Sequence, residues 1–185
     1  MSVYITVDHD DLARVQQKLG SMSAKAPRAV RDAVNNTATT ARMRLLRAAQ
    51  ARYTVKAGGF KSDAAITKAT LATLTAWIRS TGRTLSMTRY HYTHPKSGVK
   101  AEILSGSGLK PVEGPSGIKA FLAKGVVFQR RGSERLPIKS MSSPSVPKQI
   151  EVVYDGRSGA RALKKEIEAL YQANIQSQIR RMLDS

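Results

Sequence analysis

The sequence predicts an α+β fold, organised as a single domain over residues 1–185. A small, mainly antiparallel sheet is expected to be packed by a long helix in the N-terminal half and a second long helix at the C-terminus. Two observations predict this class. Apolar residues recur at helical spacing before residue 52 and again in the last thirty residues, whereas they alternate with polar residues in short runs through the middle.

A strand and a short helix are expected first. Residues 3–7 alternate apolar with polar side chains, as in a half-buried strand. Three aspartates follow and supply an N-cap and an acidic first turn for a helix. Leu12, Val15 and Leu19 share one face of that helix, and Gly20 ends it.

A longer helix is expected from Pro27, which suits a first turn, to about Arg52. One stripe of this helix is apolar, and much of the stripe is alanine, so that a neighbouring element can approach closely. Its members are Val30, Val34, Ala38, Ala41, Leu45 and Ala48.

The middle of the chain has the pattern of short strands joined by Gly- and Pro-rich connectors. Strands are expected over residues 73–78, 99–103 and 126–128. Residues 133–147 contain three prolines and five serines, which favours an extended, pinned loop.

The last helix is expected over residues 160–183. Its apolar face drifts around the axis and so offers more width than a single contact requires. Because aromatic residues make up only 5% of the chain and the core is lean, a neighbouring subunit is expected to cover part of this face. The residues expected to make this oligomer or partner contact are Leu163, Ile167, Leu170, Tyr171, Ile175 and Ile179.

Positive charge is in large excess and is unevenly distributed. Lysine and arginine number 31 against 13 acidic residues, a formal net charge of +18. Residues 25–61 hold nine bases and one acid, and residues 116–150 hold seven bases and one acid. Such a surface favours a polyanionic partner, because binding to phosphates releases counterions. The alternative is a basic protein whose charge only resists aggregation, although a net charge of about 2–8 suffices for that.

Patterns for catalysis or metal binding are weak. The chain has no cysteine, which excludes disulfides and thiolate metal sites. His91 and His94 stand three residues apart, but a zinc site needs three or four ligands, and the nearest acid is Glu102. Ser-Gly-aliphatic-Lys occurs three times, each time among turn residues and not at a helix start. We therefore expect no catalytic residue, no metal and no cofactor.

The N-terminus lacks the basic start and apolar run of a signal peptide. No stretch approaches the roughly 20 apolar residues that cross a bilayer. A soluble product made in a cytoplasm is expected.

The basic blocks are expected to contact a nucleic-acid backbone. No helix-turn-helix, zinc-finger or ribonucleoprotein pattern is recognisable, so contact with phosphates fits better than reading of bases. The alternative for any one of these residues is a charge that only keeps a helix face solvated. The residues expected to face DNA are Arg42, Arg44, Arg47, Arg52, Lys56, Lys61, Arg130, Arg131, Arg135 and Lys139.

Two stretches resemble a known family. Residues 136–147, LPIKSMSSPSVP, fit a signature in which an aromatic residue or Leu, then Pro and Ile, precede a short linker and Pro- or Gly-x-Val-Pro. An Ala- and Arg-rich helix passes into Val55-Lys56 before this signature, and a helix rich in Gln, Arg and aliphatic residues follows it. On these residues the chain resembles the prophage minor tail protein Z family. Residues 81–117 match poorly and are expected to be a variable insertion.

The resemblance implies a structural virion protein, with no enzymatic activity, in the tail or neck of a long-tailed bacteriophage. Such a protein completes the head-proximal end of the tail, assists tail–head joining and helps the genome end sit in the tail channel. Its expected partners are copies of itself in a ring, six-fold by analogy with tail symmetry, and the tail terminator, tail tube and connector proteins. Double-stranded DNA in the channel would be contacted without sequence preference, and no membrane partner is implied.

Two other interpretations stay open. A general nucleic-acid-binding protein of the host, such as a ribosome-associated or nucleoid factor, would bind free DNA or RNA tightly and with steep salt dependence. An enzyme, such as a nuclease that uses the His91–His94 pair, would lose its activity when both histidines are replaced.

Overall fold

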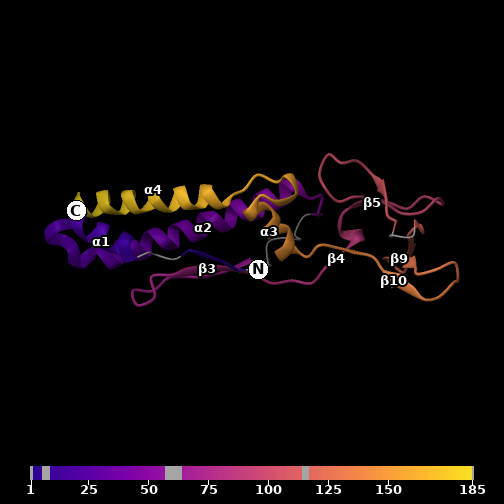
Figure 1. Cartoon of the computed structure of the whole chain (residues 1–185), viewed down its shortest axis with the longest axis horizontal. Helices are drawn as coiled ribbons and strands as arrows, with labels where there is room; N and C mark the ends of the chain where they lie inside the picture. The colour runs from indigo at the N-terminus through magenta and orange to yellow at the C-terminus, as the bar shows by residue number, and fades with distance from the viewer. Residues whose placement is uncertain (1, 6–8, 57–63, 114–116, 185) are drawn as a thin grey trace. The chain divides into compact units, whose positions relative to one another are not determined.

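A computed structural model describes residues 2–5, 9–56, 64–113 and 117–184 (Figure 1). It confirms the predicted α+β class: a long helix in the N-terminal half, a C-terminal helix and small antiparallel sheets. The chain divides into two compact units, which we describe separately. Unit 1 comprises Met1–Leu46, Ala64–Thr81 and Ile150–Ser185, and unit 2 comprises Arg47–Asp63 and Gly82–Gln149.

The helices of unit 1 follow the predicted order, with one further α-helix and two 3₁₀ turns added. They are α1 (His9–Leu19), the 3₁₀ turn η1 (Gly20–Lys25), α2 (Ala26–Arg52, up to Leu46 in this unit), α3 (Val146–Asp155, from Ile150), η3 (Arg157–Gly159) and α4 (Lys164–Leu183). The predicted C-terminal helix begins four residues later than expected. Leu163, just before it, donates its backbone N–H to the carbonyl oxygen of Val153 at 3.1 Å, which ties the start of α4 to α3.

Three antiparallel strands of unit 1 form a sheet in the order β1–β3–β2, from β1 (Ser2–Ile5), β2 (Ala64–Thr67) and β3 (Ala76–Ser80). The first predicted strand is confirmed as far as Ile5, and its remaining residues, 6 and 7, lie outside the described residues. The strand predicted over residues 73–78 starts at Ala76 instead. The hydroxyl of Thr70 accepts from the Thr73 N–H at 3.2 Å, and this local bond holds residues 70–73 in a turn.

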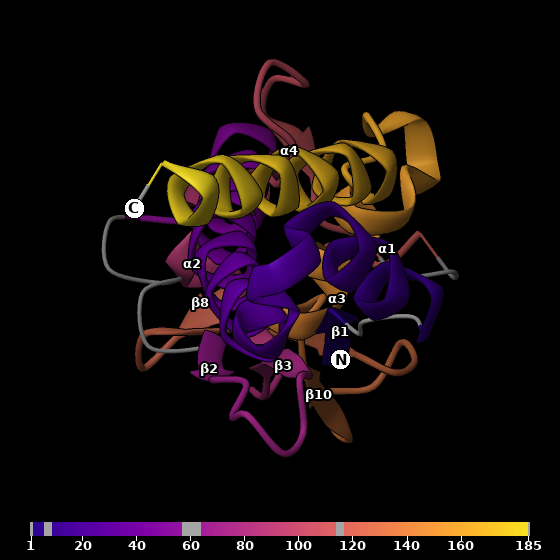
Figure 2. The same ribbon diagram turned by 90° about the vertical axis from the view of Figure 1, so that its left-hand side faces the viewer.

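Helix α2 lies between α4 and this sheet, as the two perpendicular views agree (Figures 1 and 2). The predicted alanine-rich stripe is buried, apart from the half-buried Ala48. Small side chains let neighbouring elements approach the helix closely. Asn174 of α4 donates from Nδ2 to the Thr37 hydroxyl at 2.9 Å, so a polar contact fixes the register of the two helices.

Unit 2 is built from short strands, of which only two were predicted. In chain order they are β4 (Leu85–Ser86), β5 (His91–Thr93), β6 (Lys100–Glu102), β7 (Lys110–Pro111), β8 (Phe121–Ala123), β9 (Val126–Arg130), β10 (Ile138–Ser140) and β11 (Ser142–Ser143), with the 3₁₀ turn η2 (Met87–Arg89) after β4. All pairings are antiparallel, in the orders β5–β6–β7, β10–β9–β8 and β11–β4.

The core of unit 2 draws largely on residues 81–117, the segment expected to be a variable insertion. Its buried members are Met87, Val99, Ala101, Val112, Ala120 and Val127. Four of these six side chains come from that segment, which therefore supplies most of this apolar cluster.

A second buried cluster of unit 2 is polar and consists of Tyr90, Ser143 and Gln149. The Tyr90 phenol is fully buried and lies 2.6 Å from the Ser143 hydroxyl, and it accepts from Gln149 Nε2 at 2.5 Å. Gln149 Nε2 also donates to the carbonyl oxygen of Pro144 at 2.8 Å. Burial raises the pKa of Tyr90, although its two hydrogen bonds oppose that rise.

The prediction that residues 133–147 form an extended loop is wrong in part. The segment contains β10 and β11, and α3 starts at Val146 with Pro147 in its first turn. Proline lacks only an N–H that the first turn leaves unbonded, so it starts a helix as readily as it pins a loop.

Candidate nucleic-acid interface and a basic cleft

The four predicted arginines of α2 do not share one surface. Arg44 and Arg47 are exposed. Arg42, two residues before Arg44, points to nearly the opposite side of the helix. It is half-buried, and its Nε donates to the carbonyl oxygen of Ala64 in β2 at 2.6 Å. Arg42 is therefore bonded to the sheet of unit 1, and its prediction as a DNA-facing residue is corrected.

The next predicted cations lie beside aromatic rings. Arg52 is half-buried, with its guanidinium carbon 6.0 Å from the centre of the Tyr53 ring. Lys56 is exposed, and its Nζ lies 5.1 Å from the centre of the Tyr92 ring. Such contacts hold a cation near a ring face. The Nε atom of Arg52 is buried, so only Lys56 of this pair is exposed to solvent as predicted. Lys61 falls outside the described residues.

The remaining predicted cations lie on or near the β9–β10 hairpin of unit 2. Arg130, Arg131, Arg135 and Lys139 are all exposed. The hairpin closes where the Arg131 N–H donates to the carbonyl oxygen of Pro137 at 3.1 Å. Buried Gln129 faces inward and donates from Nε2 to the carbonyl oxygen of Ile118, so strand alternation turns the next residue, Arg130, outward. The hairpin thus presents a cluster of cations to solvent.

The prediction that the apolar face of α4 contacts a neighbouring subunit is corrected by the burial of its side chains. Leu163, Ile167, Tyr171, Ile175 and Ile179 are each at most 8% exposed within this single chain. Leu170 is half-buried. The face is wide because α4 is covered inside unit 1, and these residues belong to its core.

The two histidines, His91 and His94, have different neighbours. His91 Nδ1 lies 3.0 Å from Glu102 Oε2, and the Gly106 N–H donates to Glu102 Oε1 at 2.8 Å. The hydrogen bond with His91, supported by the glycine N–H groups, lowers the pKa of Glu102. His94 is exposed, with its ring 6.2 Å from that of Tyr92. Within the described ranges, no three His or acidic side chains gather as a metal site would require.

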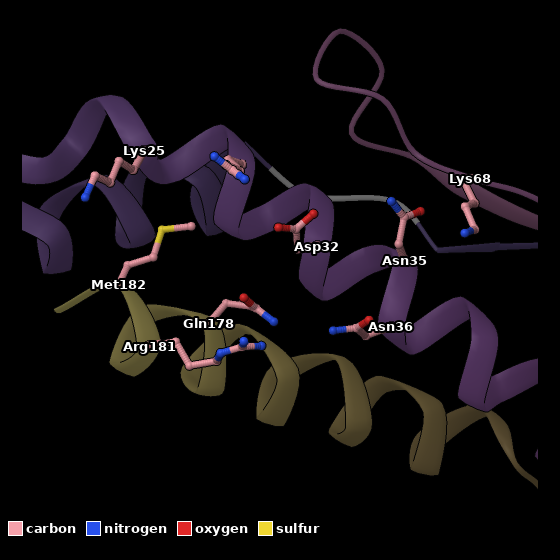
Figure 3. Close-up of a pocket in the computed structure, with 9 residues that line it drawn as sticks. Lys25, Asp32, Asn35, Asn36, Lys68, Gln178, Arg181 and Met182 are labelled. Carbon is pink, nitrogen blue, oxygen red and sulfur yellow. The ribbon is translucent and has the colours of Figure 1, made fainter. Parts of the chain in front are cut away.

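A cleft in unit 1 gathers positive charge in a recess. Its volume is about 630 Å³, and it lies between the start of α2, the end of α4 and the residue after β2 (Figure 3). Four cationic side chains and a single carboxylate line it, together with amides and one methionine. The lining residues are Lys25, Arg28, Asp32, Asn35, Asn36, Lys68, Gln178, Arg181 and Met182.

The one carboxylate among the described lining residues, that of Asp32, already has a cationic partner. Asp32 Oδ1 accepts from Arg31 Nε at 2.8 Å and from Arg31 Nη2 at 2.6 Å. In contrast, Arg28, Lys68 and Arg181 have no ion-pair or hydrogen-bond partner in the part of the chain that the structure describes. The cleft therefore keeps its positive potential.

One amide of the cleft positions its wall. Asn35 Oδ1 accepts from the Ala69 N–H at 2.8 Å, and Asn35 Nδ2 donates to the Ala69 carbonyl oxygen at 3.2 Å. This paired contact fastens the backbone next to Lys68 to helix α2. The cation from the β2–β3 connection is thereby held beside those of the helices.

Sequence reasoning did not find this cleft. Lys25 begins the first basic block, but Lys68 and Arg181 stand outside both blocks, and Gln178 carries no signal of its own. Only the fold brings these residues together, since Lys68 lies more than thirty positions after Asn36, and Gln178 lies more than a hundred positions after Lys68.

Comparison with known proteins gave no match: no family model, no curated protein and no solved structure matches the chain. The resemblance to the prophage minor tail protein Z family stays a prediction from the sequence. Among the described residues, none of the helices combines the length and the apolar character that spanning a bilayer requires.

Proposed function

We propose that this chain is a structural virion protein of a tailed bacteriophage, which completes the head-proximal end of the tail and contacts duplex DNA through its phosphates. The observation that supports the DNA contact best is the exposed cluster of Arg130, Arg131, Arg135 and Lys139 on and around one hairpin. The only acid in residues 116–150 is Glu134, so this cluster keeps a large excess of positive charge. Phosphate contacts of this kind fix a protein on a duplex without reading its sequence.

The ring assembly is part of the same proposal, but its interface must differ from the predicted one. Because the α4 face is buried inside the chain, subunits would meet through other surfaces. Native mass spectrometry over a range of concentrations tests the assembly, and a chain that stays monomeric with and without its phage partners contradicts the ring.

The DNA contact is tested with two variants that remove the same number of charges. R131Q/R135Q/K139Q removes three exposed cations near the hairpin, and K164Q/K165Q/R180Q removes three exposed cations from α4. Binding to two duplexes of unrelated sequence is measured by fluorescence anisotropy over a series of salt concentrations. Each lost phosphate contact lowers the slope of log K against log salt by about 0.9.

We expect the hairpin variant to bind both duplexes equally weakly and with a slope reduced by up to about 2.7. The α4 variant should keep the wild-type slope. Equal losses in the two variants would mean that net charge alone drives binding. A preference between the duplexes would point to base reading.

The virion assignment has its own test. Mass spectrometry of purified virions should find this chain in a few copies per particle. Its absence from virions, combined with tight binding to free DNA or RNA, would favour the host nucleic-acid-binding alternative.

A further inference from the structure

The basic cleft of unit 1 is too narrow for the duplex of the proposed function. Its volume of about 630 Å³, spread over the roughly 16 Å that residues 25–36 cover at 1.5 Å per residue, gives a mean cross-section of about 40 Å², whereas the major groove of B-form DNA alone is about 12 Å wide. A rigid double helix cannot enter such a recess and reach residues on its walls. The cations are spread along this length, from Lys25 at one end to Lys68, beside Asn35, at the other, which favours a single extended chain over one small anion.

The length of the cleft sets the size of that chain. Its cations and amides run along residues 25–36 on one wall. At 1.5 Å per residue this stretch measures about 16 Å, which is the span of about five residues of extended polypeptide at 3.3 Å each.

The chemistry of the lining separates a peptide from a single nucleic-acid strand. Proteins that bind single strands combine a basic groove with aromatic rings on which bases stack. None of the nine described lining residues is aromatic. The side-chain amides of Asn36 and Gln178 have no partner among the described residues, and Figure 3 shows them on the facing walls of α2 and α4. Each can donate to and accept from a peptide backbone.

We propose that this cleft binds an extended acidic peptide of about five residues from a partner protein. Arg28 and Arg181 bind carboxylates of the peptide, Lys25 and Lys68 add positive potential at the rims, and the two amides hold its backbone. This site is separate from the hairpin of unit 2, so the inference does not rest on the DNA contact.

The test uses the full chain and a fluorescein-labelled peptide, Glu-Asp-Glu-Asp-Glu, with Gln-Asn-Gln-Asn-Gln as the neutral reference. Affinity is measured by anisotropy for the wild type, for R28Q/R181Q in the cleft and for R44Q/R47Q on the exposed face of α2. All four arginines are exposed, and both variants remove two charges. Circular dichroism checks that each variant is folded.

We expect the acidic peptide to bind the wild type at least tenfold tighter than the neutral one. R28Q/R181Q should weaken that binding by about tenfold or more, as loss of charge-assisted hydrogen bonds predicts, while R44Q/R47Q stays within about twofold of wild type. Duplex binding by R28Q/R181Q should persist, which separates a failure here from a failure of the proposed function.

Three results overturn the proposal. Equal weakening in the two variants shows a response to overall charge. A five-nucleotide oligothymidylate that binds tighter than the peptide, and loses affinity in R28Q/R181Q, makes the occupant a nucleic-acid strand. A wild-type protein that does not distinguish acidic from neutral peptide has no such site.

If R28Q/R181Q is not folded, K25Q/K68Q replaces it, because both lysines are exposed at the rim. As a readout that needs no variant, the side-chain NH₂ resonances of Asn36 and Gln178 should shift on titration with the acidic peptide. Unchanged resonances at saturation would likewise overturn the proposal.

Discussion

Replacing Gly156 by alanine should destabilise unit 1 through two separable effects. Gly156 follows α3 with φ +74°, a left-handed conformation that costs an L-residue about 1–2 kcal/mol. A Cβ at this position would also lie 2.6 Å from the Cβ of Ala162 and 3.0 Å from its Cα and N. Because the second and third of these atoms are backbone, the chain itself must move.

The size of the second effect follows from the cost of overpacking, about 1–3 kcal/mol. The total for Gly156→Ala is then about 2–5 kcal/mol. With a urea slope of about 2 kcal/mol per molar, the unfolding midpoint should fall by about 1–2.5 M.

Gly20 supplies the matched control. It follows α1 with φ +53°, and no atom lies within 4 Å of the position where its Cβ would be built. Gly20→Ala therefore carries the conformational cost alone and should lower the midpoint by about 0.5–1 M. Adding Ala162→Gly to Gly156→Ala should recover part of the loss, because it removes the nearest clashing atom.

The measurement is urea unfolding followed by circular dichroism for the wild type and the three variants. Equal shifts for the Gly156 and Gly20 variants would refute the argument, since they would show that Ala162 does not crowd this position. A double variant with no recovery would mean that the backbone atoms of Ala162 carry the whole clash.

Two further predictions concern pH. Burial raises the pKa of Tyr90, so its contribution to stability is complete below the ordinary phenol value of 10.0 and is lost as the pH rises through the folded-state pKa. Tyr90→Phe should cost about 1–2 kcal/mol at neutral pH and should weaken the alkaline fall of the urea midpoint; an unchanged fall would contradict this role. The pKa of Glu102 is lowered, chiefly by its hydrogen bond with His91, so its contribution is present above the ordinary value of 4.5 and is lost as the pH falls through the folded-state pKa. Glu102→Gln should flatten the decline of the unfolding temperature on the acid side, and a parallel decline in wild type and variant would rule that out.

The long helices could be predicted because their signals are long. The alanine-rich stripe of α2 repeats over several turns, and the structure buries nearly all of it. Periodicity over such a length is the most reliable pattern in a single sequence. Strands of two residues, such as β4 and β11, contain no full repeat and leave no pattern to detect.

The width of the apolar face of α4 did not show whether another subunit or the same chain covers it. A broad apolar face fits either a subunit contact or burial inside one chain, and periodicity is the same in both. Tyr171 and Ile175 are buried because α1 and α2 cover the side of α4 on which they lie. The sequence shows which residues are cationic, but it does not show which surface each of them faces. Charge favours exposure in general, yet it did not indicate that Arg42 lies on the side of α2 that bonds to β2.

The paired contact between Asn35 and Ala69 has a thermodynamic consequence. It joins the β2–β3 connection to α2, and α4 forms the opposite wall of the cleft. A ligand bound in the cleft would therefore contact three segments that are far apart in the sequence. A ligand that needs all three segments in position binds only the folded state, and it therefore shifts the unfolding equilibrium toward the folded state by mass action. At a concentration of one hundred times its dissociation constant it would add about 2.7 kcal/mol, so the melting temperature of unit 1 itself becomes a gauge for screening unknown ligands.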